Sequence, residues 1–367
     1  MLPSYFNLEK RFYYNRLNPY EKALYGFWVE SLLRGYRKLI YLPSEEYAPN
    51  AEESGYAPCF FYGAYGNDID YCKVWSYMIY DCPELYFIYH YTLGVDRENH
   101  TLYFGGDTPD YSDGEIEEIN AKLEEILHIF DGISDPFLLE LAVHDYITKQ
   151  YEFDFEGRAE IEKDGVVMDR RFYEKFTVVG LLKRGCAVCG GFIKLLQFVL
   201  QCRGFEVANI LDIAGDYGRL HSWLAVKLDG KYYHLDLTFN EGSTLDLDYP
   251  QYKYFNITDE EIWQDHEFSY EKYPEILCNS TEFNYYHKMG LFFKTKEEIT
   301  EAVDKHIKSM PSITSHSRFY FRTPKDLELK TVSYAIGNAL KQNGMPMAST
   351  SFTDEDGYYA LEINGDG

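Results

Sequence analysis

A two-residue turn near the middle of the chain constrains the fold more than any other feature of the sequence. Residues 221–238, HSWLAVKLDGKYYHLDLT, form two strand-like halves joined by Asp229 and Gly230. Asp-Gly is a favoured pair for the type I′ turn of a two-residue β-hairpin. We therefore predict an antiparallel hairpin in which Val226 pairs with Tyr233 and Trp223 lies opposite Asp236.

Side chains alternate between the two faces of such a hairpin. One predicted face is a core face, with Leu224, Val226, Leu228, Tyr233, Leu235 and Leu237. The other carries His221, Trp223, Ala225, His234, Asp236 and Thr238. On this second face His221 is diagonal to Asp236, with backbones about 7 Å apart, a gap that imidazole and carboxylate can bridge. A one-residue slip of the register would turn Asp236 into the core.

A cysteine precedes this hairpin at a predicted helix start. In residues 186–207, CAVCGGFIKLLQFVLQCRGFEV, apolar residues recur every three or four positions, so we predict a buried helix from about Cys189 to Gly204. The N-terminal end of a helix lowers the pKa of a thiol. We also expect Gly190 and Gly191 to leave space in which a substrate can approach the sulfur.

The Cys186-x-x-Cys189 pair has other interpretations. Zinc would need two more ligands at suitable spacing, and no second pair lies nearby. A redox dithiol would have the whole motif at the helix start after a strand. Cys186 is therefore expected to be structural, although a regulatory disulfide with Cys189 stays open. His234 is a second candidate for the base, and His144 with Asp145 is expected to support the site rather than to react.

Cys189, His221 and Asp236 together have the residue types of a nucleophile, its base and the group that orients the base. Trp223 is expected to form a wall beside the imidazole, and Gly190 to support the cysteine. These residues predict acyl transfer through a thiol, with no cofactor and no metal.

The same stretches carry a family resemblance. AVCGGFIKLLQFVLQCRGFEV followed by HSWLAVKLDGKYYHLDLTF resembles the transglutaminase-like superfamily of cysteine enzymes. The segments DCPELYF, HDYITKQYEFD and YKYFNITDEEIWQDH resemble its bacterial branch. The sequence departs from the family pattern at Gly190, Phe192 and Asn240, and it has no evident calcium-binding loop.

This resemblance implies an α+β fold with a papain-like, transglutaminase-like core, in which the cysteine helix packs on an antiparallel sheet. It also implies amide chemistry through a thioester. We favour peptide hydrolysis, as in a cysteine protease. Protein crosslinking, deamidation and a catalytically idle peptide-binding module are the alternatives.

The charge of the chain narrows its partners. Among 367 residues there are 60 Asp and Glu against 35 Lys and Arg, and no basic stripe is present. This excess of acid disfavours nucleic acid and anionic membranes, so a peptide or protein substrate is expected. No apolar segment is long enough to span a membrane, no signal peptide is evident, and the seven cysteines are irregularly spaced. These features favour a cytoplasmic protein, and its oligomeric state is left open.

Three parts are expected along the chain. Residues 1–105 are predicted as an N-terminal subdomain, with a helix over 19–38 and strands over 84–93 and 101–104. Residues 106–290 are predicted as the catalytic core, with helices over 112–130 and 135–150. Residues 291–367 are predicted as a small α/β module, with a capping box at Thr295 and Glu298, a strand at RFYFR, a helix opening at Pro324 and a strand at GYYALEI.

Overall fold

The structure is a computed structural model of the chain. It describes residues 6–33, 40–41, 69–88, 92–96, 101–105, 111–164, 170–215, 218–241, 251–311, 317–345, 350–355 and 357–363. Within these ranges the chain is a mixed helix and sheet protein that divides into two compact units, Met1–Ser280 and Thr281–Gly367.

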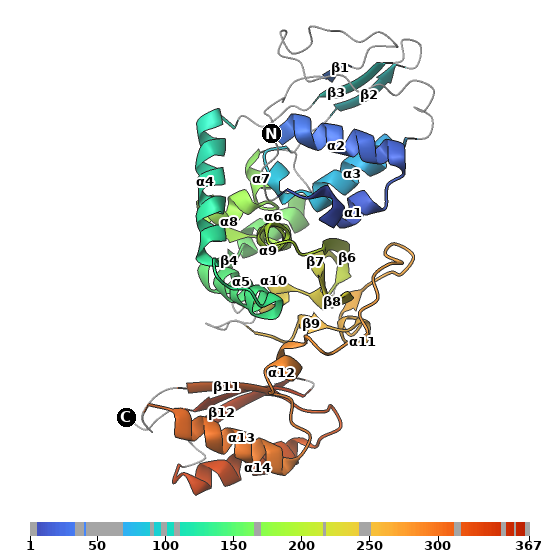
Figure 1. Ribbon diagram of the computed structural model, residues 1–367. Coiled ribbons are helices and arrows are strands. Elements are labelled where there is room, and N and C mark those ends of the chain that lie inside the picture. The colour runs from blue at the N-terminus through green and yellow to red at the C-terminus, as the bar shows by residue number, and fades with distance from the viewer. Residues whose placement is uncertain are drawn as a thin grey trace. The chain divides into compact units, whose positions relative to one another are not determined.

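The first unit contains most of the helices (Figure 1). Its helical elements are η1 (Leu8–Lys10), α1 (Phe12–Asn15), α2 (Pro19–Leu33), α3 (Tyr71–Asp81), η3 (Pro83–Leu85), α4 (Asp113–Ile129), α5 (Pro136–Gln150), α6 (Phe155–Asp164), α7 (Arg170–Glu174), α8 (Val178–Arg184), α9 (Cys189–Cys202), α10 (Leu237–Asn240) and α11 (Asp259–Ile262). The helices predicted over 112–130 and 135–150 are confirmed as α4 and α5, with Ser112 and Asp135 as their N-caps. The helix predicted over 19–38 is α2 as far as Leu33, and residues 34–38 lie outside the described ranges.

The main sheet of this unit has five antiparallel strands in the order β10-β6-β7-β8-β9. The strands are β6 (Val207–Ala214), β7 (Arg219–Leu228), β8 (Lys231–Leu235), β9 (Phe255–Ile257) and β10 (His266–Glu267). A smaller sheet has the order β1-β3-β2, from Ile40–Tyr41, Thr101–Gly105 and Thr92–Asp96. The two short strands β4 (Glu152–Phe153) and β5 (Cys186–Ala187) pair in parallel.

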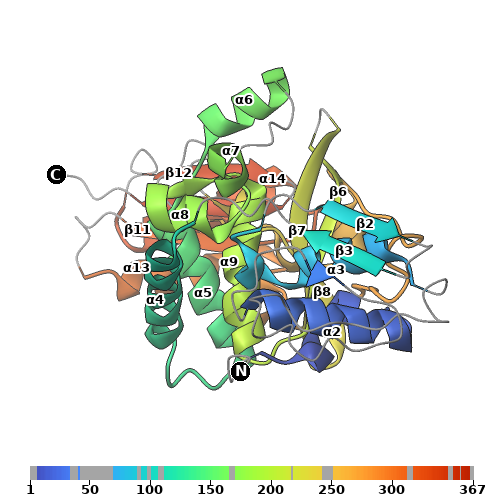
Figure 2. The same cartoon turned by 90° about the horizontal axis from the view of Figure 1, so that it is seen from above.

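Helix α9 lies in the interior of the first unit. It packs on β7 and β6 on one side and on α5 and α4 on the other, and the two views of the molecule show this order (Figure 1 and Figure 2). Burial explains its sequence, because twelve of its residues, including all its Phe, Leu, Ile and Val side chains, are buried. It ends as predicted, with Gly204 in the left-handed region at φ 87°.

The predicted hairpin register is confirmed. Leu228 pairs with Lys231, Val226 with Tyr233 and Leu224 with Leu235. The Asp-Gly turn has positive φ at both residues, 46° at Asp229 and 76° at Gly230, as a type I′ turn requires.

The hairpin differs from its prediction in two respects. Both faces are buried, since Trp223 and Ala225 lie in a core cluster with Phe12, Ile257 and Phe268, and the face of Val226 is buried as well. Strand β8 also ends at Leu235, so Asp236 lies beyond the ladder instead of opposite Trp223 and serves as the N-cap of α10. A free pair of backbone N–H groups at Thr238 and Phe239 explains this, because the aspartate oxygen accepts both.

A buried arginine attaches the N-terminal segment to the core of the first unit. Arg11 is 1% exposed, and its Nη2 lies 2.6 Å from Oε1 of Glu84. Its Nη1 donates to the carbonyl of Asp81 and to the side chain of Gln201 on α9. The two compact units do not separate residues 1–105 from the rest of the first unit, and the division of this unit into a subdomain and a core stays a prediction.

The strand predicted over 84–93 is wrong for the residues that are described. Pro83–Leu85 is a 3-10 helix, and strand β2 begins only at Thr92. Pro83 favours this, because it is the first residue of the 3-10 helix, where the fixed φ of proline suits a helical turn and its missing N–H is not needed. Residues 89–91 lie outside the described ranges.

The second unit is a three-stranded antiparallel sheet with α13 and α14 on one face (Figure 1). Its elements are α12 (Tyr285–Lys288), α13 (Lys296–Ser309), β11 (Ser317–Arg322), α14 (Leu329–Gln342), β12 (Thr350–Glu355) and β13 (Tyr358–Ile363), and the strand order is β11-β13-β12. The capping box at Thr295 and Glu298 and the two predicted strands are confirmed. The last helix begins at Leu329, five residues after Pro324, because the N–H of Leu327 first closes a turn on the carbonyl of Pro324 and Glu328 is the N-cap.

Candidate active site

Cys189 is the first residue of α9, where the sequence predicted it. Val188 precedes it in extended conformation and caps the helix with no side-chain hydrogen bond. Cys189 is 7% exposed, so the sulfur is nearly but not completely enclosed. A thiol at this place meets the positive end of the helix dipole.

The two glycines after Cys189 have a different role from the expected one. A Cβ on Gly191 would lie 2.4 Å from the Cβ of Ala187, and one on Gly190 would lie 3.0 Å from the carbonyl oxygen of Phe176. Both spaces are therefore occupied by the protein itself. Gly190 and Gly191 let the segment before α8 lie close against the start of α9, and they do not open a path for a substrate.

His221 and Asp236 meet at the end of the main sheet. Strand β7 extends past the last pair that it makes with β8, and His221 lies in this extension. Its Nε2 is 2.6 Å from Oδ2 of Asp236. The other carboxylate oxygen accepts the backbone N–H groups of Thr238, at 2.8 Å, and Phe239, at 3.1 Å. The helix cap thus fixes the carboxylate that holds the imidazole.

The charges of this group depend on one another. Burial favours the neutral thiol of Cys189, but a hydrogen bond and the positive charge of His221, with the N–H of Ser222, outweigh it and lower the pKa of Cys189. Burial also disfavours imidazolium, yet Asp236 and Cys189 raise the pKa of His221 to about 10. The pKa of Asp236 lies well below its usual range despite burial, because His221 and His266 donate to it. The arrangement therefore favours a thiolate–imidazolium pair over a neutral thiol beside a neutral imidazole.

Aromatic rings enclose the imidazole of His221. Trp223 lies nearly parallel to it, with centroids 6.1 Å apart, and Phe239 does the same at 5.1 Å. The expectation that Trp223 forms a wall beside His221 agrees with this geometry. Such walls exclude water and so strengthen the electrostatic interactions of the pair.

His266 is a member of this network that sequence reasoning missed. From strand β10, its Nε2 lies 3.0 Å from the same Oδ2 of Asp236, and its Nδ1 lies 2.6 Å from Oδ1 of Asp265. Burial opposes its charge, but the two carboxylates outweigh burial and raise the pKa of His266. The stretch ending at residue 266 resembled the family. However, Asp236 and His266 are 30 positions apart, and no pattern in the sequence predicts their contact.

His234, the alternative base, belongs to a separate cluster. Its Nε2 is 2.8 Å from Oδ1 of Asp259, and its Nδ1 accepts the indole N–H of Trp223 at 3.1 Å. Burial lowers the pKa of His234 and outweighs the contribution of Asp259. His234 is therefore a neutral residue of the core, and the structure does not bring it to Cys189.

Two groups of donor atoms have the closeness that a metal site requires. They are His221 with Asp236 and His266, and His234 with Asp259 and Cys278. Metal ligands must be deprotonated. In the first group both ring nitrogens of His266 lie at carboxylates, which favours the protonated ring. In the second group the indole N–H of Trp223 donates to Nδ1 of His234, so the ring proton is on Nε2. Burial also raises the pKa of Cys278, which favours the neutral thiol. These residues fit hydrogen-bonded networks better than metal centres.

Cys189 and His221 open into a cavity of about 240 Å³. Its lining is aromatic, small and basic, and consists of Phe153, Phe155, Arg158, Cys189, Ala214, Gly215, Arg219, His221, Thr238 and Phe239. Phe155 and Arg158 had no place in the sequence analysis because they come from α6, and Arg219 was missed although it lies two positions before His221 on β7. The cavity gives small molecules access to the sulfur.

The other candidate residues lie elsewhere. Cys186 is half-buried on strand β5, with Nη2 of Arg184 3.7 Å from its sulfur, and the structure records it and Cys189 as free thiols. His144 is fully buried in α5, where its ring lies 5.1 Å from that of Phe255 and its Nδ1 is 3.1 Å from Oδ1 of Asp145. Neither His144 nor Asp145 lines the cavity at Cys189.

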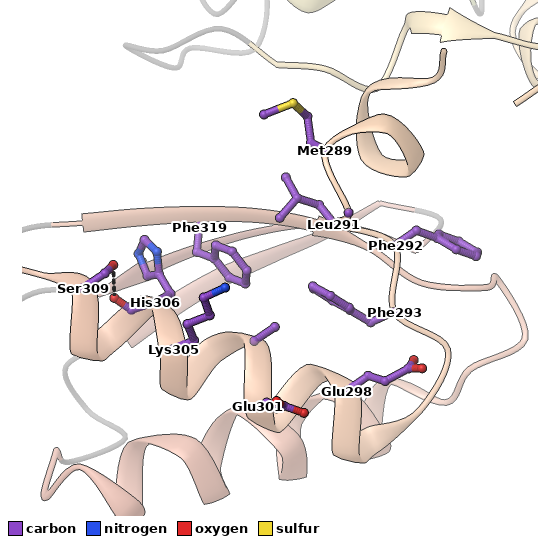
Figure 3. Close-up of a pocket in the computed structure, with 12 residues that line it drawn as sticks. Met289, Leu291, Phe292, Phe293, Glu298, Glu301, Lys305, His306, Ser309 and Phe319 are labelled. Carbon is purple, nitrogen blue, oxygen red and sulfur yellow. Dashed lines mark hydrogen bonds between the residues drawn. The ribbon is translucent and has the colours of Figure 1, made fainter. Parts of the chain in front are cut away.

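A larger cavity of about 580 Å³ occurs in the second unit (Figure 3). It lies between α13 and the segment 289–293, with Phe292, Phe293 and Phe319 among its walls. Its histidine, His306, has Nε2 2.8 Å from Oγ of Ser317 and packs on Phe319. No thiol lines this cavity, and no carboxylate contact of His306 is recorded among the described residues, so its size does not make it the reactive centre.

Among the residues that the structure describes, no helix combines the length and the apolar character that a membrane crossing requires.

Comparisons with known proteins give only partial likeness. No protein-family model matches the sequence, and no curated protein sequence is similar to it. A crystal structure of a TGase overlaps with 40% of this chain and 43% of its own, at 14% identity and a TM-score of 0.31. A protein named "Putative Cysteine Protease from Cytophaga hutchinsonii" overlaps with 42% of this chain and 63% of its own, at 11% identity and a TM-score of 0.26. The chain thus spans less than two thirds of either neighbour, and at these TM-scores the overlap assigns it no fold family and no activity.

Proposed function

We propose that the first unit is a thiol-dependent enzyme that cleaves or transfers acyl groups at amide bonds, built on a transglutaminase-like, papain-like core. The observation that supports this most is the coupled charge state of Cys189 and His221 at a cavity. Burial raises the pKa of a cysteine that only packs in the core, and it does so for Cys82 and Cys278. The pKa of Cys189, by contrast, is lowered.

Each residue has a defined part in the proposed reaction. The Cys189 thiolate attacks the carbonyl carbon of the amide, and the C=O π electrons move to the oxygen. His221 then donates its proton to the nitrogen, the electron pair on the oxygen re-forms the C=O bond, and the C–N bond breaks. The amine leaves, and a thioester remains on Cys189. Asp236 holds His221 through Nε2, so Nδ1 is the nitrogen left to face the sulfur.

The acyl acceptor decides between the possible outcomes. When water attacks the thioester, His221 takes its proton, the S–C bond breaks and the net reaction is hydrolysis. When a primary amine attacks instead, the product is a new amide, as in crosslinking. We favour hydrolysis of peptides, which needs no second substrate besides water.

A screen of peptides and glutamine-containing proteins, each with and without a primary amine, tests this proposal. New amino termini without dependence on amine indicate hydrolysis, ammonia release alone indicates deamidation, and incorporated amine indicates transfer. Cys189→Ser is the matched control, since it removes the thiol and keeps the size of the side chain. Turnover that persists in Cys189→Ser would contradict the proposal, and binding of peptides without turnover would favour an idle binding module.

A further inference from the structure

Two arginines line the cavity that holds the thiol. Arg158 comes from α6 and Arg219 from the first position of β7, and both are lining residues of the cavity with Cys189 and His221. We propose that this cavity binds a carboxylate of the acyl group, so that the preferred substrates carry a negative charge next to the amide that reacts. This inference rests on the proposed function and names its substrate class.

The local charge contrasts with that of the whole chain. The protein carries a formal charge of −25, yet this small cavity has two guanidinium groups and, at His221, an imidazole whose pKa is about 10. Arginine does not lose its proton in proteins. A net-acidic protein repels anions at a distance, so positive charge gathered in the lining of a reactive cavity selects anions there.

The chemistry of the walls suits a carboxylate with a short carbon chain. A guanidinium has five N–H donors, so it can bind a carboxylate while it keeps a contact within the protein, such as that of Arg158 Nη1 with the carbonyl of Leu220 at 3.5 Å. Phe153, Phe155 and Phe239 provide apolar walls, which strengthen ion pairing by excluding water. The volume of about 240 Å³ is below the roughly 300–1,000 Å³ of pockets for drug-sized ligands, so one side chain or chain end fits.

Two small alkylating agents test this directly. Iodoacetate and iodoacetamide differ by a carboxylate in place of a carboxamide, and with both the thiolate sulfur displaces iodide to form a carboxymethyl or carbamidomethyl thioether. The ratio of their rate constants at Cys189, measured by mass spectrometry of the Cys189 peptide, reports the preference for a carboxylate. Because the imidazolium of His221 also attracts iodoacetate, the informative quantity is the change of this ratio between variants.

We expect the ratio to fall roughly tenfold in Arg158→Gln and in Arg219→Gln, and further in the double variant, as for loss of a charge-assisted hydrogen bond. Arg219→Lys, which keeps the charge, should retain part of the preference for iodoacetate. Arg171→Gln is the matched control, because Arg171 is exposed on α7 and does not line the cavity. Unchanged melting temperatures would show that the variants fold.

Protection of Cys189 from iodoacetamide distinguishes the sources of the carboxylate. N-acetylglutamate α-amide presents a side-chain carboxylate and N-acetylglycine presents a chain-end carboxylate, with N-acetylglutamine amide and N-acetylglycinamide as their neutral controls. Stronger protection by either acid than by its neutral control supports the inference and names the source. A ratio that is the same in wild type, Arg158→Gln, Arg219→Gln and the control, with rapid reaction of iodoacetamide, overturns this inference and leaves the proposed function standing. An iodoacetamide rate no higher than that of glutathione overturns both.

Discussion

His221 and His266 share one hydrogen-bond acceptor: their Nε2 atoms lie 2.6 Å and 3.0 Å from Oδ2 of Asp236. One carboxylate oxygen can accept two hydrogen bonds. The other oxygen, Oδ1, accepts the backbone N–H groups of Thr238 and Phe239. Asp236 is therefore saturated with donors and completely buried. The consequences of this arrangement can be measured one residue at a time.

Asp236→Asn is expected to reduce the turnover of any accepted substrate by about 10³–10⁴-fold. The amide cannot stabilise imidazolium as the carboxylate does, and it can hold the wrong tautomer of His221. The upper limb of the pH–rate profile, set by a His221 pKa of about 10, should move toward the ordinary histidine value of about 6.5. Activity in Asp236→Asn equal to that of wild type, with an unmoved upper limb, would show that Asp236 does not orient His221.

His266→Gln is expected to reduce the free energy of unfolding, by about 1–3 kcal/mol at pH 5. The pKa of His266 is raised in the folded protein, so its contribution is fully present below the unfolded-state pKa of about 6.5 and is lost as pH rises through the folded-state pKa. The difference between wild type and variant should therefore shrink from pH 5 to pH 9. Urea unfolding at several pH values measures it, and a difference that grows with pH would contradict the charge assigned to His266.

The same variant has an effect on the proposed chemistry that a purely structural role would not produce. Protonated His266 disfavours a second positive charge at His221. Without it, the pKa of His221 should rise and the upper limb of the pH–rate profile should move to higher pH, opposite to the shift in Asp236→Asn. His266 is a positioning residue in this account, and its variant should lose much less turnover than Asp236→Asn.

Gly191→Ala is expected to destabilise the protein by about 1–3 kcal/mol. Its new methyl group would lie 2.4 Å from the Cβ of Ala187, so the start of α9 must move. Gly114→Ala on α4 is the matched control, since its Cβ has nothing within 4 Å, and it should leave stability unchanged or raise it by up to about 1 kcal/mol. Equal melting temperatures of the two variants would show that the close approach at Gly191 is not required.

Local patterns in the sequence predicted the elements that hold the candidate site. The Asp-Gly pair fixes the register of β7 and β8 because its backbone conformation is specific. The periodic apolar residues predict α9 because their side chains are buried in the structure. The capping box of Thr295 with Glu298 was predicted for the same local reason.

Contact between distant segments is the part that the sequence could not provide. His266 reaches Asp236 only because β10 pairs with β6 at the far side of β7. Arg158 and Arg219 meet in one cavity through the packing of α6 beside β7. Asp236 is a different case. The alternation of side chains predicted it as a residue of strand β8, but the strand ends at Leu235 and Asp236 is the N-cap of α10.

The most direct test of the central claim is the pH dependence of Cys189 alkylation by iodoacetamide, in wild type and in His221→Ala. We expect the rate constant in wild type to fall less steeply from pH 8 to pH 6 than that of an ordinary thiol, because His221 lowers the pKa of Cys189. In His221→Ala the rate constant should fall about 100-fold between pH 8 and pH 6, as for an ordinary thiol of pKa about 8.5. A wild-type rate that follows an ordinary thiol, unchanged by His221→Ala, would contradict the account.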